Sequence, residues 1–284
     1  MTRFGPSGND VTFYAQGNKS SVQAPAWLAS MGLTALEINF GRGVKLSEKT
    51  AAEIGSQAKK HNITLSVHAP YYINLASSDE QMIRKSYVYI EMCIRVMKFL
   101  GSNRLVIHIG SQCDLQRGEA IENCKKNLMW VISELKRNDF KDFFLFIETM
   151  GRYKAIGDYK EVCEICKIDP CVIPTLDFGH INCTEQGELK RNPERIREIM
   201  EYCIKELGDK MRNVHIHFSY VKFGQKGELA HTTLDDKKWA FPFEPLAQVI
   251  QEEKLEPIII CESQDIMAQD AKRLQAIWQN VAAN

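Results

Sequence analysis

Short, almost continuous apolar runs alternate with longer amphipathic stretches along the whole chain of 284 residues. Near-continuous hydrophobicity within a run, rather than strict alternation, is typical of parallel strands covered on both faces. The runs therefore predict strands over residues 35–39, 63–68, 103–108, 143–148, 173–177, 213–218 and 257–262, with a weaker first strand over 2–5.

The amphipathic stretches between these runs predict helices, because their apolar positions recur at helical spacing. The clearest helix begins after Ser78, where Gln81 three residues further on completes a capping box, and it ends before Gly101. Further helices are predicted near 46–61, 116–138, 158–167, 193–207, 243–253 and 266–281.

Eight predicted strands, each followed by a helix or a long loop, favour an α/β fold with a single (β/α)8 TIM barrel. No linker, low-complexity tract or change of composition divides the chain, so we expect one TIM-barrel domain over residues 1–284. An open doubly wound sheet is the alternative, but no G-x-G-x-x-G motif follows the first strand.

Residues of metal-ligand type stand at the carboxyl ends of the predicted strands. These residues are His68, His108, Glu148, Asp177 and Glu262, and the seventh strand carries His215 and His217 facing the same side. All strand ends of a barrel converge on one mouth, where active sites are built. The sequence therefore predicts that these side chains meet in a single cup.

Several carboxylates and imidazoles gathered in a semi-buried cup would repel one another and lose solvation unless a cation neutralised them. Mixed nitrogen and oxygen ligands suit zinc, with manganese or iron as alternatives. His180 in the turn after strand six, and Glu228 and His231 in the loop after strand seven, extend the cup. The set is large enough for two or three ions if one carboxylate bridges.

Seven stretches of this sequence resemble the endonuclease IV family, the metal-dependent apurinic/apyrimidinic endonucleases built on a TIM barrel. They are SVHAPYYINLAS (66–77), LVIHIGS (105–111), LFIETMGR (145–152), LDFGH (176–180), NVHIHFS (213–219), FGQKGELAH (223–231) and ICESQ (260–264). They occur in the family's order over nearly the whole chain. The resemblance implies a DNA-repair hydrolase that cleaves double-stranded DNA on the 5′ side of abasic sites.

The resemblance also implies a trinuclear zinc site. Its ligands would be His68, His108 and Glu148 for one ion, the bridging Glu148 with Asp177, His215 and Glu262 for a second, and His180, His231 and an acidic neighbour for a third. The chain departs from the family at that neighbour, because Leu229 stands where the family has the Asp of an Asp-x-His motif. Glu228 is the nearest substitute, and His217 is the other.

The same resemblance implies catalytic and DNA-binding roles. Glu148 would fix the separation of two ions, and Glu262 would orient the attacking water. Arg42, in the loop after the second strand, is the positional candidate for the family's arginine that enters the abasic gap. Tyr71 and Tyr72 would wedge the base stack, although a tyrosine pair that only covers the barrel mouth is an equal alternative.

Two other functions remain open on the sequence. Glu148, Asp177, His215 and Glu262 also match the single-metal tetrad of sugar isomerases and keto-sugar epimerases, but that chemistry leaves His68, His108 and His231 without a task. A non-catalytic DNA-binding relative, which kept the fold and lost turnover, is the second alternative.

Composition limits the partners and the cellular compartment that we expect for the protein. Lys+Arg and Asp+Glu both number 36, which disfavours an evenly basic nucleic-acid binder, although bound cations would make the mouth locally positive. Nine Cys without a signal peptide predict free thiols in the cytoplasm, and Cys163 and Cys166 are expected on the buried stripe of a helix. No apolar run has the length of a membrane helix, so we expect no membrane partner. We expect a monomer.

Overall fold

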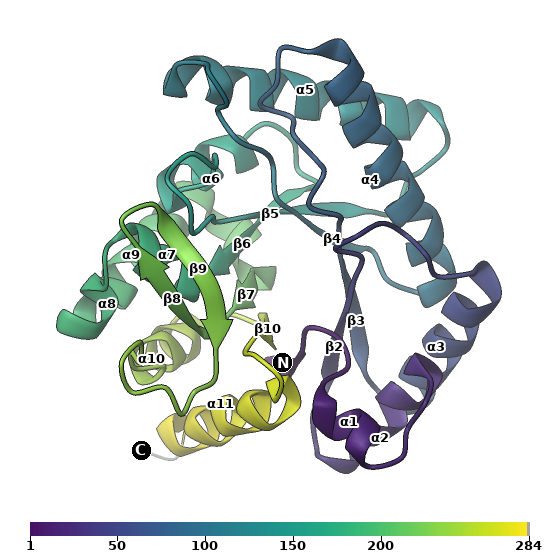
Figure 1. The fold of residues 1–284 in the computed structure, drawn as a ribbon, viewed down its shortest axis with the longest axis vertical. Helices are drawn as coiled ribbons and strands as arrows, with labels where there is room; N and C mark the ends of the chain where they lie inside the picture. Colours follow the sequence, from purple (N-terminus) through teal and green to yellow (C-terminus); the bar gives the residue numbers. More distant parts are fainter. Residues whose placement is uncertain (283–284) are drawn as a thin grey trace.

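Eight parallel strands form a barrel in the computed structural model, which describes residues 1–282. The strands are β1 (Arg3–Pro6), β2 (Ala35–Asn39), β3 (Thr64–His68), β4 (Arg104–Ile107), β5 (Phe144–Glu148), β6 (Val172–Asp177), β7 (His215–His217) and β10 (Ile258–Cys261). Helices surround them on the outside (Figure 1). The predicted TIM barrel is confirmed.

The long helices follow the strands in the predicted order. They are α3 (Glu48–Lys60), α4 (Glu80–Leu100), α5 (Arg117–Arg137), α6 (Tyr159–Cys166), α9 (Glu194–Leu207), α10 (Glu244–Glu252) and α11 (Met267–Ala282). Short helices add α1 (Val11–Ala15), α2 (Ala24–Ser30), α7 (Phe178–Thr184) and α8 (Glu188–Arg191), with 3₁₀ turns at Ser21–Gln23 and Gly208–Asn213.

The strand order is β1-β10-β7-β6-β5-β4-β3-β2, and every neighbouring pair is parallel. The two ends of this order, β1 and β2, meet at a seam that carries one parallel bridge, between Ser7 and Glu37. The seam matters for the site because it brings a carboxylate into the barrel interior.

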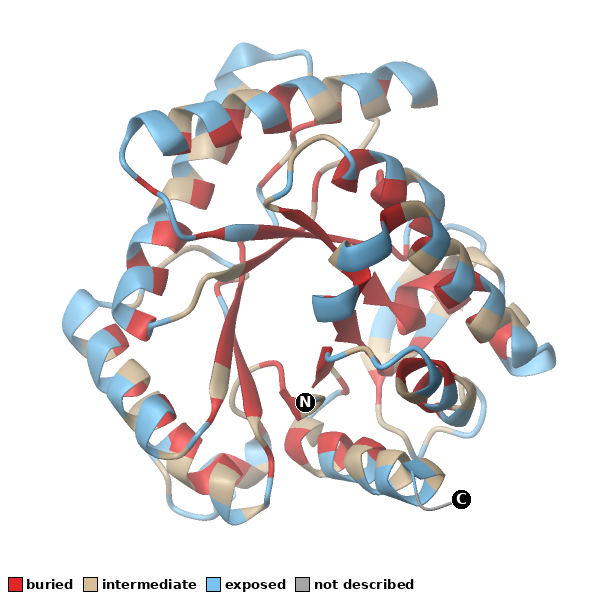
Figure 2. Cartoon of the chain, turned by 180° about the vertical axis from the view of Figure 1, so that it is seen from behind, coloured by how far each residue is buried: buried red, intermediate tan, exposed pale blue. Residues whose placement is uncertain are grey.

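The main hydrophobic core lies between the strands and the outer helices, and two small apolar clusters fill the barrel itself. Figure 2 shows this division, with buried residues along the strands and on the inner faces of the helices. One interior cluster, Val106, Phe146 and Ile173, comes from three neighbouring strands. The barrel is therefore a packed core whose polar groups gather toward one end.

Three local features differ from the prediction. Asp79, not Ser78, caps α4, because its carboxylate accepts a hydrogen bond from the Gln81 backbone. His180 lies on the short helix α7 rather than in a turn. Glu228 and His231 lie on a strand of an antiparallel hairpin, β8 (Tyr220–Gly224) and β9 (Gly227–Thr232), rather than in an irregular loop.

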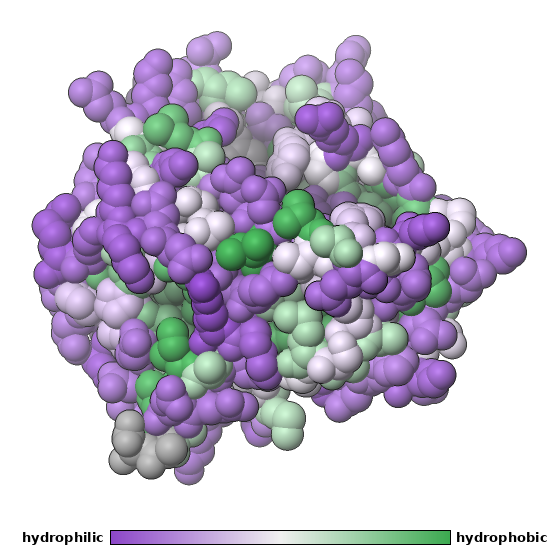
Figure 3. All heavy atoms as spheres, turned by 60° about the horizontal axis from the view of Figure 1, so that its bottom comes forward, coloured by the Kyte–Doolittle hydropathy of each residue, from purple (hydrophilic) through white to green (hydrophobic). Residues whose placement is uncertain are grey.

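Cys163 and Cys166 lie on the buried face of α6, as predicted, and both are free thiols. Within residues 1–282, no helix has the length and hydrophobicity that crossing a membrane requires. The face of the molecule in Figure 3 is largely hydrophilic, and its hydrophobic side chains form small separate clusters.

Candidate metal centre

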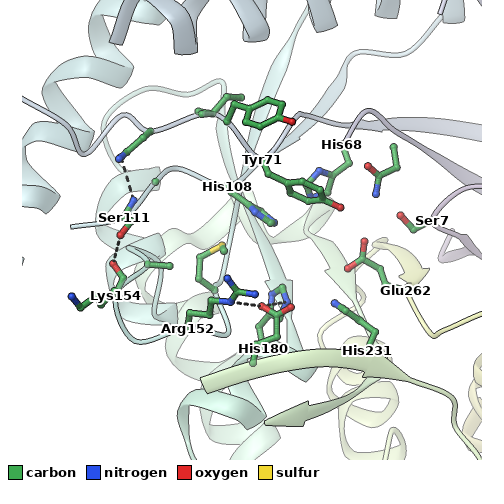
Figure 4. Close-up of a pocket in the computed structure, with 18 of the residues that line it drawn as sticks. Ser7, His68, Tyr71, His108, Ser111, Arg152, Lys154, His180, His231 and Glu262 are labelled. Atoms are coloured by element: carbon green, nitrogen blue, oxygen red, sulfur yellow. Dashed lines mark hydrogen bonds and ion pairs between the residues drawn. The ribbon is translucent and has the colours of Figure 1, made fainter. Parts of the chain in front are cut away.

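A cavity of about 860 Å³ opens at the carboxyl ends of the barrel strands. His68, His108, His180, His231 and Glu262 line it, and Figure 4 shows these five side chains turned toward a common centre. They come from β3, the end of β4, α7, β9 and the end of β10. The barrel strands bring His68, His108 and Glu262 together because they all end at the same mouth, and α7 and β9 add His180 and His231 there.

The first ligand group joins β3, β4 and β5. Nε2 of His68 lies 3.0 Å from Glu148 Oε2, and Nε2 of His108 lies 2.9 Å from the same oxygen. The other ring nitrogen of His68 lies 2.9 Å from the backbone carbonyl of Ala69, which fixes the orientation of that imidazole. The structure thus brings His68, His108 and Glu148 together as the sequence predicted.

The second group shares Glu148 with the first. Nδ1 of His217 lies 3.2 Å from Glu148 Oε1, 3.3 Å from Glu262 Oε2 and 3.8 Å from Asp177 Oδ2. The ligand atoms of these four residues all lie within 4.8 Å of one another. Glu148 therefore turns one carboxylate oxygen toward each group, which is the arrangement of a bridging ligand.

The third group consists of His180, Glu228 and His231. Nε2 of His180 lies 3.7 Å from Glu228 Oε2, and the rings of the two histidines are 5.5 Å apart between centroids. Gly151 permits this approach, because a Cβ there would lie 2.8 Å from both Glu228 Cβ and His180 Cδ2. Of the two substitutes considered for the acidic residue of the third group, Glu228 therefore joins His180 and His231, and His217 does not.

The structure groups His215 with Glu37 and His217 and not, as expected, with Asp177 and Glu262. Nε2 of His215 lies 3.1 Å from Glu37 Oε2, deeper in the barrel, and His217 stands with Asp177 and Glu262 instead. Both histidines face the interior, as the two-residue period requires. The register of β7 decides between them, because His217 is level with Asp177 whereas His215 is level with Thr175.

Glu37 is a residue of the site that the sequence interpretation passed over. It lies on β2, its side chain is fully buried, and its oxygens face His215, His217 and two serine hydroxyls. The available signal was a single charged residue inside the apolar run ALEIN of a predicted strand. Because buried carboxylates are rare without partners, such a residue marks a polar site within a barrel.

Neighbouring charges outweigh burial in setting the pKa of Glu148 and Glu262, whereas burial outweighs them at Asp177. Burial alone would raise the pKa of Glu148, but His108 and His217 hold that pKa well below its ordinary value. Burial likewise opposes ionisation of Glu262, yet His217 lowers its pKa to about 2. For Asp177, burial prevails and raises the pKa, although His180 opposes it.

The donor set fits divalent metal ions. Asp177 Oδ2 is buried and has no hydrogen-bond partner among the described residues, although it faces His180 and His217. An unpartnered buried carboxylate oxygen is costly, and a bound cation would remove that cost. Imidazole nitrogens with carboxylate oxygens are ligands that zinc accepts, and manganese is compatible with the carboxylates.

The predicted DNA-binding residues divide into two sets. Tyr71 and Tyr72 both line the cavity with about half of each side chain exposed, and the Tyr71 ring lies 5.8 Å from that of His108. Tyr72 packs against Tyr89 of α4. Arg42 is exposed in the loop after β2 and does not line the cavity.

Relatives of this chain include proteins with and without an assigned activity. The chain is 27% identical over 264 residues to an uncharacterized protein of Methanocaldococcus jannaschii, covering 93% of this chain and 92% of that protein. It is 24% identical over 174 residues to a probable endonuclease 4 of Streptomyces avermitilis, covering 59% of this chain and 55% of that protein.

Solved structures share the fold. Endonuclease IV from Thermus thermophilus superposes with a TM-score of 0.69 at 18% identity, covering 94% of this chain and 96% of that one. A D-tagatose 3-epimerase-like protein superposes with a TM-score of 0.67 at 19% identity, covering 88% and 89%. The family model described as xylose isomerase-like TIM barrel matches residues 25–278. The expected kinship is thereby confirmed, and the chain belongs to the AP endonuclease 2 family of xylose isomerase-like TIM barrels.

Proposed function

We propose that this protein is a zinc-dependent phosphodiesterase that hydrolyses double-stranded DNA on the 5′ side of abasic sites. The observation that carries the proposal is the presence of three adjoining ligand groups at one barrel mouth, two of which share Glu148. The family of the chain and its relatives named probable endonuclease 4 support the same activity. A single-metal enzyme that used the second group would have no use for the first and third groups.

On this proposal, three zinc ions have candidate ligands in the chain, with manganese as the alternative metal. The ligands are His68, His108 and Glu148 for the first ion, Glu148, Asp177, His217 and Glu262 for the second, and His180, Glu228 and His231 for the third. When bound, the ions supply positive charge that polarises a phosphoryl oxygen and makes water easier to deprotonate at neutral pH.

The chain's own residues prepare the nucleophile and receive the substrate. Glu262 lines the cavity and, with its pKa near 2, is ionised at neutral pH. Its carboxylate can therefore accept a hydrogen bond from the attacking water and orient it toward phosphorus. Tyr71 and Tyr72 stand at the rim, where they would stack on bases next to the lesion.

Selection of the lesion would be steric on this proposal. Drawing a nucleotide out of a duplex costs least where base pairing is already absent. An abasic sugar-phosphate would therefore reach the floor of the cavity more easily than an intact nucleotide. Arg42, which lies outside the cavity lining, has no role in the proposal.

A labelled duplex that carries one tetrahydrofuran abasic analogue tests this activity. We expect the zinc-loaded protein to nick the labelled strand on the 5′ side of the analogue and to leave the undamaged duplex intact. Glu148→Gln should abolish nicking, because that substitution weakens two ligand groups at once. Glu119→Gln, on the exposed face of α5, is the matched control and should retain activity.

An intact lesion duplex after exhaustive incubation with folded, zinc-loaded protein would contradict the proposal. Binding to the lesion duplex without cleavage would instead favour a non-catalytic DNA-binding relative. To distinguish these two outcomes, binding of the lesion duplex and its cleavage are measured on the same protein sample.

A single-metal sugar epimerase is the second candidate, and one observation favours it. Glu148, Asp177, His217 and Glu262 form a four-ligand group of their own, and D-tagatose 3-epimerase-like and D-psicose 3-epimerase structures share this fold. In that chemistry, two glutamates would move a proton at the carbon beside a ketose carbonyl. One manganese ion per chain, with epimerisation of a free ketose and no nicking, would establish this candidate instead.

A further inference from the structure

The carboxylate of Glu37 lies inside the barrel, beneath the second ligand group. Its Oε2 lies 3.1 Å from His215 Nε2 and accepts a hydrogen bond from Ser66 Oγ at 2.9 Å. Its Oε1 lies 3.3 Å from His217 Nε2 and 3.5 Å from Ser7 Oγ. Glu37, Ser66 and the two histidines are buried almost completely, so the carboxylate is shielded from bulk solvent.

His217 is oriented differently from the other histidines of the cup. Its Nδ1 faces the carboxylates of Glu148 and Glu262, and its Nε2 faces Glu37. In contrast, Nε2 of His68 faces Glu148, and its Nδ1 is held by a backbone carbonyl. Nε2 of His217 has no hydrogen-bond partner among residues 1–282, and the Glu37 oxygen 3.3 Å away is the ionic neighbour that it faces.

The group behind each imidazole also differs. Thr149 O lies 2.9 Å from Nδ1 of His180, and Ser219 Oγ lies 2.8 Å from Nδ1 of His231. These partners are neutral, as is the Ala69 carbonyl behind His68. Nδ1 of His180 also lies 3.4 Å from Glu148 Oε1 and 3.5 Å from Asp177 Oδ2. His217 differs from the other three histidines because the carboxylate at its outer nitrogen, that of Glu37, belongs to none of the three ligand groups.

A histidine that binds a metal through one ring nitrogen carries its proton on the other. A carboxylate at that second nitrogen fixes the tautomer and the ring orientation, and it makes the ligating nitrogen more basic. We propose that Glu37 is a positioning residue that holds the Nε2–H tautomer of His217 and so presents Nδ1 to the ion between Glu148, Asp177 and Glu262. This inference rests on the proposed metal centre.

The neighbours of Glu37 leave its carboxylate one orientation. His215 and Ser66 hold Oε2, and Ser7 approaches Oε1 across the β1–β2 seam. A backbone bridge between Ser7 and Glu37 joins the two strands at this seam. His215, which does not reach the cup, thus acquires a function as a support for Glu37.

Glu37→Gln removes the charge and keeps the shape of the side chain. We expect the variant to bind zinc about 10–100-fold more weakly at one site, as measured by competition with a chromophoric chelator, with the other sites unchanged. Glu119→Gln is the matched control, because it is the same substitution on the exposed face of α5. Its zinc affinities should stay within a few-fold of those of the parent protein.

A spectroscopic measurement on the parent protein does not depend on how the variant folds. In zinc-loaded protein with 15N-labelled histidine, two-bond couplings should show His217 with zinc on Nδ1 and a proton on Nε2, and His217→Gln identifies the signal. That proton should resonate further downfield in the parent protein than in Glu37→Gln. Zinc on Nε2 of His217 would overturn the inference, and so would equal zinc affinities in a folded Glu37→Gln variant.

These outcomes separate the inference from the proposed function. A parent protein that binds several zinc ions but fails to nick abasic DNA contradicts the function and leaves the role of Glu37 standing. A parent protein that nicks DNA, with a Glu37→Gln variant that binds zinc equally well, contradicts the role of Glu37 alone.

Discussion

His215 and His217 occupy the same face of β7 but different depths in the barrel. His217 is level with Asp177 and reaches the cup, whereas His215 is level with Thr175 and reaches Glu37. A difference of two residues therefore separates a candidate metal ligand from a group that supports it. This difference can be measured directly by substituting each histidine in turn.

We expect His217→Gln to lose one zinc ion per chain and His215→Gln to keep the full number. His217 supplies a nitrogen within 3.8 Å of three carboxylates, whereas His215 contacts Glu37. Metal content after loading and gel filtration checks the prediction. The opposite pattern, with zinc lost from the His215 variant alone, would show that β7 has a different register in solution.

Residues of the cup were predictable from the sequence where the end of an apolar run marks the end of a strand. His68, Glu148 and Asp177 each close an apolar run, and each is the last residue of its strand. The choice between His215 and His217 was not available, because a two-residue period places both on the same face. Only hydrogen bonding to the neighbouring strands β6 and β10 sets the height of β7.

The histidines of the site predict how the stability of the metal-free protein depends on pH. Burial opposes protonation of His68, but Glu148 at 3.0 Å outweighs it and raises the pKa from 6.5 to about 9. Its stabilising contribution is therefore complete below pH 6.5 and is lost as pH rises toward 9. Burial lowers the pKa of His215 to about 4, so its contribution holds above pH 6.5 and is lost as pH falls toward 4.

We therefore expect the urea midpoint of the chelator-treated protein to be highest near pH 6.5 and to fall toward pH 9. Bound zinc should reduce the fall of the urea midpoint between pH 6.5 and pH 9, because a metal-bound imidazole is neutral in the folded state. His68→Gln should also reduce this fall. His61→Gln, at the end of α3 away from the cup, should leave it unchanged. An alkaline slope in His68→Gln equal to that of the parent protein would refute the assignment.

At the scale of elements, the β8–β9 hairpin carries Glu228 and His231, two of the three residues of the third ligand group. It packs against α7 and is tied to the loop after β5, where the Glu228 backbone N–H donates to the Gly151 carbonyl at 2.7 Å. Gly227 makes this contact possible. Its φ is +95°, and a Cβ at that position would lie 2.2 Å from the Gly151 oxygen.

We expect Gly227→Ala to displace Glu228 from His180 and to lose one zinc ion, while the barrel remains folded. The destabilisation should be about 1–3 kcal/mol, the cost of a strained backbone conformation, as measured by urea unfolding. Gly208→Ala is the control, because Gly208 also has positive φ but has open space around its Cβ position. Full zinc content in Gly227→Ala would exclude the hairpin as the carrier of the third group.

The main strands and helices were predictable because each repeats one hydrophobic period over several residues. The hairpin was not, because most side chains of β8 and β9 are exposed or half-buried and neither strand has an apolar run. Helix α7 was missed because it is short and buried throughout most of its length, so it shows no amphipathic period. Both elements take their structure from the barrel against which they pack.

At the scale of the whole molecule, the barrel brings residues that are distant in the sequence to one cavity. His68 and Glu262, which are far apart in the sequence, line one cavity because β3 and β10 end at the same mouth. The formal net charge of zero does not oppose a polyanionic substrate, because bound divalent cations would make the cup locally positive. The central claim is that this mouth holds several cations at once.

The number of zinc ions per chain tests that claim most directly. The protein is stripped with chelator, reloaded with zinc, freed of excess metal and measured by elemental mass spectrometry against its amino-acid content. Two to three zinc ions per chain are predicted, falling by at least one in Glu148→Gln. A parent protein that retains one ion or none would contradict the multi-metal centre.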